Sequence, residues 1–215
     1  MSEELKKYFE LMKERPEQFR PSDMICIETD LDRIQNYERE TGKKIGVIYR
    51  SAYNIFVVDL IRTNNGTYYT YERLLPAVKV GAVVALVMCQ NRFVLLKQYR
   101  HAIRDFQYAF PRGYGEEGVN AEENVRKEIQ EEIGATVIGT EYLGTVVADS
   151  GLCGNAVSVF ICEVENVIEK YGYEGIESMV MLEEEELAAW IQNGDITDGF
   201  SLAAYGLYKA RLLNI

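Results

Sequence analysis

Three glutamates near the middle of the chain have a spacing that suits metal chemistry: Glu128, Glu131 and Glu132. At about 100° per residue, a helix predicted from Asn120 to Ile133 places them together beside an apolar stripe. Like charges three and four positions apart repel by roughly 0.2–0.5 kcal/mol per pair, so the cluster costs stability unless a cation offsets it. Mg²⁺, with Mn²⁺ as the alternative, is a hard cation that binds carboxylates and phosphates together. The other interpretation is a solvated acidic face of the helix.

A glycine-rich loop immediately before this helix favours the metal interpretation. The loop reads Pro-Arg-Gly-Tyr-Gly at 111–115, and backbone N–H groups in such a loop can approach a phosphate closely. Asn120 is a good N-cap with Glu123 as its capping-box partner, and Gly134 is a C-terminal stop signal. We therefore expect the acidic helix edge and the loop to form one site for a phosphate group.

The segments around this helix predict the framework that positions it. Strands are expected on both sides of the helix, over 80–88, 92–98, 106–110, 137–142, 146–148, 157–164 and 179–181, with two closing helices over 183–193 and 201–213. This order indicates an α/β fold, a sandwich around a mixed sheet.

The segment before residue 77 has a different pattern. Residues 1–44 are charged and helix-like, whereas 45–76 contain three strand-like runs, 46–50, 55–63 and 67–74, with an Asn-Gly hairpin turn near residue 65. We therefore divide the chain into a helical segment 1–44, a small antiparallel β unit 45–76 and a main domain 77–215. A small antiparallel unit exposes strand edges, which makes a dimer partner a reasonable expectation.

Composition excludes several classes of protein. The 215 residues carry 23 Lys and Arg against 34 Asp and Glu, and the resulting net charge of −11 argues against general nucleic-acid binding. The longest apolar stretch, 80–89, is about half of the roughly 20 residues that cross a bilayer, so we expect a cytoplasmic protein without a membrane span. Its four cysteines lack C-x-x-C spacing, and we interpret all four as reduced thiols in or near the core.

The segment from Gly113 to Ala135 resembles the box of the Nudix hydrolases, G-x5-E-x7-R-E-U-x-E-E-x-G-U, where U is a bulky aliphatic residue. The chain fits the box without gaps, and the matching residues are Gly113, Glu128, Ile129, Glu131, Glu132 and Gly134. Flanking segments resemble the ADP-ribose pyrophosphatase branch over about 45–213. The resemblance implies a Nudix α/β/α sandwich, Mg²⁺-dependent attack of water on a diphosphate linkage, and a homodimer that exchanges N-terminal strands.

Four positions depart from that pattern. Val119 stands at the first glutamate of the box and Lys127 at its arginine. Ala109 stands where many members of the branch have a glutamate, and Gly151 where ADP-ribose hydrolases often have proline.

The resemblance also implies roles for individual residues. Glu128 and Glu132 become the principal metal ligands, with Glu131 as a third ligand or outer group, and the main-chain carbonyl of Arg112 joins them. Glu174, in a loop before the last strand, is the expected general base; otherwise it is a solvated acid.

Several further side chains are candidates for holding the substrate. Besides Gly113 and the Arg112 side chain, Arg100 and Arg104 are candidates for phosphate or ribose, because guanidinium groups match phosphate oxygens in pairs. A structural ion pair is the other interpretation of these arginines. Tyr99 and Tyr108 are candidates for stacking a base, although tyrosines in strands are more often part of a core or an interface.

Two functions remain open from the sequence. The first is a pyrophosphatase acting on a small nucleoside diphosphate derivative, with ADP-ribose or a nucleotide sugar as the first candidates. The second is a catalytically impaired ligand sensor or interaction module of the same fold, motivated by Val119, Lys127 and Ala109. A nucleoside triphosphatase is a weaker alternative, because the extra N-terminal unit suits the ADP-ribose branch better.

Overall fold

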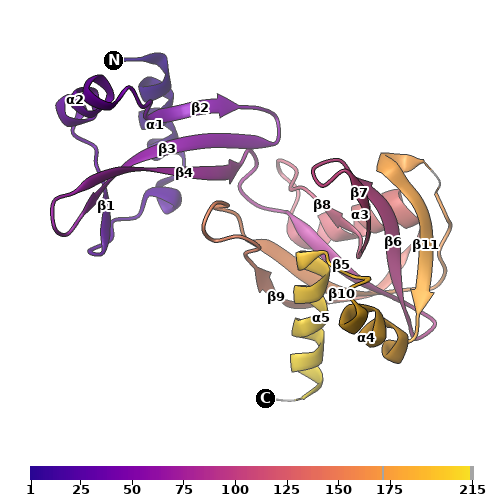
Figure 1. The fold of residues 1–215 in the computed structure, drawn as a ribbon. Helices are drawn as coiled ribbons and strands as arrows, with labels where there is room; N and C mark the ends of the chain where they lie inside the picture. Colours follow the sequence, from indigo (N-terminus) through magenta and orange to yellow (C-terminus); the bar gives the residue numbers. More distant parts are fainter. Residues whose placement is uncertain (171, 214–215) are drawn as a thin grey trace. The chain divides into compact units, whose positions relative to one another are not determined.

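The computed structural model describes residues 1–170 and 172–213, and it divides into two compact units. One unit comprises residues 1–77 and 149–155, and the other comprises 78–148 and 156–215 (Figure 1). Residues 171, 214 and 215 lie outside the description. Each unit is considered by itself.

The first unit is a small antiparallel sheet packed against helices. Its elements are α1 (Glu3–Glu14), a short 3-10 helix (Pro16–Phe19), β1 (Ile25–Ile27), α2 (Leu31–Thr41), β2 (Gly46–Arg50), β3 (Asn54–Thr63) and β4 (Tyr68–Pro76). Strand β3 pairs with β1, β2 and β4, so three neighbours depend on it. The antiparallel β unit expected from the hairpin pattern is therefore present, and the short strand β1 extends it.

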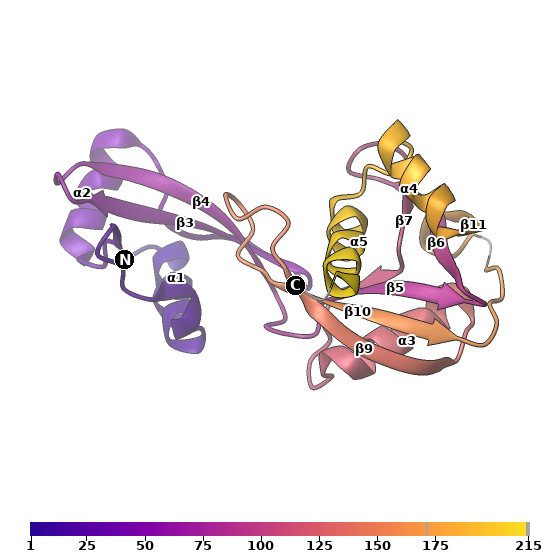
Figure 2. The same cartoon turned by 90° about the horizontal axis from the view of Figure 1, so that it is seen from below.

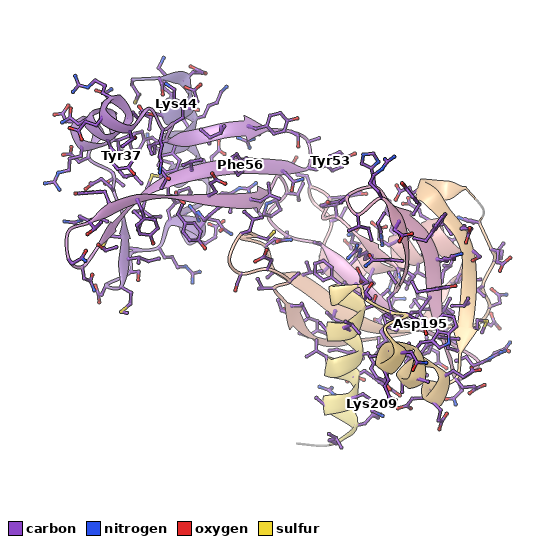
Figure 3. The ribbon with its side chains drawn as sticks, viewed as in Figure 1. Tyr37, Lys44, Tyr53, Phe56, Asp195 and Lys209 are labelled. Atoms are coloured by element: carbon purple, nitrogen blue, oxygen red, sulfur yellow. The ribbon has the colours of Figure 1, made fainter. Side chains whose placement is uncertain are left out.

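Apolar residues of α1 and α2 form two clusters with this sheet. Leu5, Tyr8 and Leu11 are fully or almost fully buried on α1, and Tyr37 and Phe56, which Figure 3 labels, belong to the second cluster. The Tyr8 hydroxyl donates a 2.5 Å hydrogen bond to the buried carboxylate of Asp59. The helical segment and the strands thus share one core.

The second unit contains a seven-stranded mixed sheet. Its elements are β5 (Val83–Cys89), β6 (Arg92–Arg100), β7 (Asp105–Ala109), β8 (Arg112–Gly113), α3 (Ala121–Ile133), β9 (Val137–Val146), β10 (Val157–Val164), a 3-10 turn (Tyr173–Gly175), β11 (Ile176–Leu182), α4 (Glu184–Asn193) and α5 (Gly199–Leu212). The main path runs β11-β6-β5-β10-β9, with β7 on β6 and β8 on β5. Strands β5 and β10 are parallel, and the other pairs are antiparallel.

Helices cover both faces of this sheet. Val125, Ile129 and Ile133 of α3 join the core on one face, while α4 and α5 pack on the other (Figure 1). Figure 2 shows these layers from the side, with α3 and α5 on opposite sides of β5 and β10. Lys209 of α5, labelled in Figure 3, forms an ion pair with Glu184 of α4 and so links the two helices of that layer. The expected α/β/α sandwich around a mixed sheet is confirmed.

The structure corrects one element of the sequence prediction. The runs 137–142 and 146–148, expected as two strands, form the single strand β9, which ends at Val146. The register with β10 shifts between Tyr142 and Gly144, where Gly144 has a φ of 156°. An irregularity of this kind breaks the alternation of side chains without ending the strand, which is why the pattern looked like two strands. Strands β1 and β8 were not predicted, because their two or three residues carry no periodicity of their own.

Candidate active site

The helix α3 positions the acidic cluster as its sequence predicts. Asn120 caps its first turn with a complete capping box, and Gly134 ends it in the left-handed conformation with a φ of 62°. Val125 and Ile129 are fully buried against the sheet. Glu128 and Glu132 follow on the edge of this buried face, one helical turn apart.

Burial and mutual repulsion make both carboxylates unusual. Burial first, and then the charge of Glu131, raises the pKa of Glu128 to about 7. Burial first, and then the charge of Glu128, raises the pKa of Glu132 to about 8. Glu132 is only 3% exposed, and its Oε2 is buried without a hydrogen-bond partner among the described residues. Such a pair of crowded carboxylates is a site where a cation would lower the free energy.

The loop before α3 meets these carboxylates directly. A Cβ atom on Gly113 would lie 1.7 Å from Oε1 of Glu128, so no other residue fits there without moving this carboxylate. The backbone of Arg112 lies close to the carboxylate of Glu132 and acts to lower its pKa, as an N–H donor does, against the larger effect of burial. Gly113 is therefore required by the acidic cluster itself.

The pairing of β8 determines which way the main chain of Arg112 faces. The carbonyl of Pro111 accepts a 2.8 Å hydrogen bond from the N–H of Ala85, so it points toward β5. In an extended strand the N–H and C=O of successive residues point to alternate edges. The N–H and C=O of Arg112 therefore point away from β5, to the edge where its main chain meets Glu132.

Asn124 fixes the other part of the loop, and sequence reasoning missed it. Its side chain is fully buried and its Nδ2 donates to the carbonyls of Gly81 at 2.6 Å and Tyr114 at 2.8 Å. It thus ties the start of α3 to the segment before β5 and to the glycine loop. The sequence does contain a hint of this role, because Asn124 is an amide residue next to the apolar stripe, one residue before Val125.

We expect Asn124→Leu to lower the free energy of unfolding by about 1–3 kcal/mol for each carbonyl left buried without a donor. Thermal unfolding followed by circular dichroism measures this change. The control is Asn193→Leu, at the exposed last residue of α4, which should change the melting temperature little. Asn91 is less suitable because its φ of 63° makes any substitution there strained. An unchanged melting temperature for Asn124→Leu would contradict the role assigned to this amide.

Arg100 and Glu174 approach the acidic pair from β6 and from the turn before β11. Burial, and then the nearby charge of Arg112, lowers the pKa of Arg100, while Asp198, then Glu132 and Glu174, act in the opposite direction. The charge of Glu174 also contributes to the raised pKa values of Glu128 and Glu132. These side chains are therefore near enough to influence one another electrostatically, with Glu174 exposed and Glu132 buried.

The turn that carries Glu174 is fixed by two further contacts outside the sequence prediction. Nε2 of Gln98 donates a 2.8 Å hydrogen bond to the carbonyl of Glu174, whose φ is 46°. Nζ of Lys170 donates to the carbonyls of Gln130 and Glu131 at the end of α3. These contacts attach the segment before β11 to β6 and to α3.

Tyr99 and Arg104 are placed differently from Arg100. The Tyr99 ring packs edge-to-face on Phe106 at 5.3 Å, and the Arg104 guanidinium lies 5.8 Å from the centre of the Tyr99 ring. Arg104 is exposed and also contacts His101 at 3.0 Å. The contacts seen for Tyr99 and Arg104 are thus within the β6–β7 hairpin, and a role in holding substrate stays a prediction. Tyr108 packs on Trp190 at 4.8 Å, as expected of a core tyrosine.

Lys127 has two acidic partners near the loop. Its ammonium group pairs with Glu116 in the loop and lies 3.8 Å from Glu131 on the next turn. The box has a glutamate at position 119, where this chain has Val119. Glu116, three residues earlier, supplies the carboxylate that pairs with Lys127 instead. The ion pair links the glycine loop to α3.

The acidic pair has the features of a site for a divalent cation that substrate and water complete. Within residues 1–170 and 172–213, no three His, Cys, Asp or Glu side chains are arranged to hold a metal. Mg²⁺, however, is commonly held by one or two carboxylates together with substrate phosphates and water. Glu128 and Glu132, with a buried oxygen that has no partner, fit that requirement.

Comparisons with known proteins identify the family and the fold of this chain. The family model of the NUDIX domain matches residues 78–198. The crystal structure of an ADP compounds hydrolase aligns with a TM-score of 0.67 and 16% identity, covering 80% of this chain and 92% of that chain. At this identity the likeness shows the fold. A search of curated proteins found no significant match.

Proposed function

The chain belongs to the NUDIX domain family, and on that premise we propose that it hydrolyses the diphosphate linkage of a small nucleoside diphosphate derivative in a Mg²⁺-dependent reaction. The observation that carries the proposal is the crowded pair Glu128 and Glu132, with raised pKa values and a buried oxygen without a partner. A divalent cation would offset the negative charge of this cluster, and the phosphate oxygens of the substrate would complete its coordination.

The metal would be held by Glu128, Glu132 and the main-chain carbonyl of Arg112, with Glu131 as a third or outer group. This assignment is supported by the direction of the Arg112 main chain in β8, where its N–H and C=O face the same edge, and by the effect of the Arg112 backbone on the pKa of Glu132. When bound, Mg²⁺ or Mn²⁺ would neutralise the diphosphate and lower the pKa of a water molecule. Gly113 would leave the space that the Glu128 carboxylate needs.

The remaining roles fall to side chains around the pair. Arg100 would bind a phosphate oxygen, because it is half-buried and its Nε has no hydrogen-bond partner in the described part of the chain. Glu174 would accept the proton of the attacking water, since it is exposed and close enough to influence both carboxylates. Its loop position would let it approach once substrate is bound.

ADP-ribose or a nucleotide sugar is the proposed substrate class, which agrees with the fold shared with an ADP compounds hydrolase. We also propose that the protein acts as a homodimer through its small antiparallel unit, without nucleic-acid or membrane partners. In the described residues, no helix has both the length and the apolar character of a membrane span. A cytoplasmic location is supported by four cysteines that are all free thiols.

A substrate panel tests the proposal. Purified protein is incubated with ADP-ribose, nucleotide sugars, dinucleoside polyphosphates and nucleoside triphosphates, with Mg²⁺ or with a chelator, and nucleoside monophosphate is measured by chromatography. We expect Mg²⁺-dependent release from the diphosphate derivatives. A folded protein that hydrolyses none of them refutes the proposal, and calorimetry showing tight binding without hydrolysis would favour the sensor instead.

A further inference from the structure

A buried network at the start of α5 contacts the strand that leads into the glycine loop. Asp198 is the N-cap of α5 and is 5% exposed, and Ser201 is 1% exposed. One carboxylate oxygen of Asp198, Oδ2, accepts from the N–H of Ser201 at 3.0 Å and from its hydroxyl at 2.8 Å. The cap therefore uses one oxygen and leaves the other for a second partner.

The same two residues hold both ends of the segment Phe110–Arg112. The hydroxyl of Ser201 accepts a 2.9 Å hydrogen bond from the N–H of Phe110. Oδ1 of Asp198 lies 2.9 Å from Nη1 of Arg112. The guanidinium of Arg112 also lies 5.1 Å from the centre of the Phe200 ring, so two residues at the start of α5, Asp198 and Phe200, set its position.

This arrangement changes the interpretation of the Arg112 side chain. The sequence made it a candidate for binding phosphate, but its guanidinium is paired with a nearly buried carboxylate and lies over an aromatic ring. Arg100, whose Nε is buried without a partner in the described ranges, lies near the same acidic pair. Asp198 therefore influences both arginines, but it is paired only with Arg112, whereas Arg100 retains an unused donor.

We propose that Asp198 and Ser201 are positioning residues, which act through Arg112 and Phe110 to hold the Arg112 main chain against Glu132. The Arg112 guanidinium is then an anchor of the loop, and Arg100 is the guanidinium that meets the diphosphate. This inference rests on the proposed function, because the Arg112 carbonyl matters only if Glu132 and its neighbours bind a cation. Removing a group that orients a metal ligand without touching the metal typically lowers metal affinity or activity by about 10–100-fold. We expect a loss of that size when Asp198 or Ser201 is replaced.

Mn²⁺ binding to the resting protein tests the inference without turnover. Free Mn²⁺ is measured by electron paramagnetic resonance for the wild type and for Ser201→Ala and Asp198→Ala. We expect each variant to bind Mn²⁺ about 10-fold more weakly. Ser201→Thr, which keeps the hydroxyl, should bind near the wild-type value. Asp30→Ala is the matched control, because Asp30 caps α2 through the N–H of Arg33 in the other unit; it should leave Mn²⁺ binding unchanged.

A double-mutant cycle separates anchoring from a general loss of stability. Arg112→Met and Asp198→Ala remove the two partners of one ion pair, so the double variant should bind Mn²⁺ no more weakly than the weaker single variant. Asp198→Asn, which keeps an oxygen for Arg112, replaces Asp198→Ala if the latter does not fold. Equal Mn²⁺ affinity of the wild type and the folded variants would overturn the inference.

Kinetics provide the second measurement. Anchoring predicts that Arg112→Met lowers kcat at a given Mn²⁺ concentration more than it raises the KM for substrate, whereas a phosphate ligand would mainly raise KM. A raised KM with unchanged Mn²⁺ affinity for Arg112→Met would also overturn the inference. If the wild type itself neither binds Mn²⁺ nor hydrolyses any substrate, the proposed function has failed. If the wild type does both and the variants match it, only the inference about Asp198 and Ser201 has failed.

Discussion

Glu132→Gln is expected to reduce turnover about 10²–10³-fold while the melting temperature of the metal-free protein rises. Loss of a carboxylate that holds the cation removes several kcal/mol of charge stabilisation in the transition state, and each 1.36 kcal/mol is about tenfold in rate. The same substitution replaces a carboxyl group that is 3% exposed, and whose ionised form is disfavoured by burial and by the neighbouring Glu128. Activity and stability should therefore change in opposite directions.

The pH dependence of the stability gain follows from the direction of the pKa shift. In the folded protein the pKa of Glu132 is raised to about 8 from an ordinary value of 4.5. Its proton therefore stabilises the folded state fully below pH 4.5, and this contribution is lost as the pH rises through about 8. With a chelator present, the difference in melting temperature between Glu132→Gln and the wild type should be small at pH 5 and largest above pH 8.

Glu122→Gln is the matched control on the same helix. Glu122 is exposed and pairs with Arg126 one turn along, so its loss should change stability by less than about 0.5 kcal/mol and leave turnover unchanged. Steady-state kinetics and differential scanning calorimetry measure both quantities. Turnover by Glu132→Gln at the wild-type rate would remove this glutamate from the metal site.

Gly113→Ala is expected to lower turnover about 10²-fold with little change in melting temperature. The new Cβ would lie 1.7 Å from Oε1 and 1.9 Å from Cδ of Glu128, so the carboxylate must leave its position. A displacement of about 1 Å in a reacting arrangement costs on the order of 10²-fold in rate. The displaced group is the end of a side chain, and the backbone of Gly113 is not in the left-handed region, so the fold itself has little reason to change.

Two other glycines provide contrasting controls. Gly206→Ala lies inside α5 with no atom within 4 Å of the new Cβ, so it should stabilise the protein by about 0.5–1 kcal/mol and leave turnover unchanged. Gly115→Ala would place its Cβ 1.9 Å from the carbonyl oxygen of Val80, a backbone atom, and should lower the melting temperature. One result would contradict this prediction: Gly113→Ala lowers the melting temperature as much as Gly115→Ala does, and its turnover falls only as much as the folded fraction. The contact with Glu128 would then not be the main effect of the substitution.

Lys127 and Glu116 show why departures from a family pattern need three-dimensional information. Aligned with the box, Val119 and Lys127 look like the loss of a glutamate and an arginine. In the structure, Lys127 still has an acidic partner in the loop, because Glu116 reaches it from a different position. The half-exposed pair is expected to contribute modestly, at about 0–1 kcal/mol, but it preserves the link between the loop and α3.

The elements with strong periodicity were predictable from the sequence. The run 157–164 is strand β10, and the predicted helix between Asn120 and Gly134 is α3 with its cap and stop residues. In both cases short-range signals decide the structure, since side-chain alternation, a capping box and a left-handed glycine act within a few residues. Strands β1 and β8 were not predictable, because only pairing with distant strands defines them.

The sequence by itself determined the helix that carries Glu128 and Glu132 and the glycine that leaves room beside it, because these depend on spacing within one segment. Only the tertiary structure decided which other side chains join them. Asn124 finds its partners on Gly81 and Tyr114, and Arg112 finds Asp198 more than eighty positions along the chain. Contacts of this kind arise from the packing of separate elements around one sheet, and the pattern of any single element does not contain them.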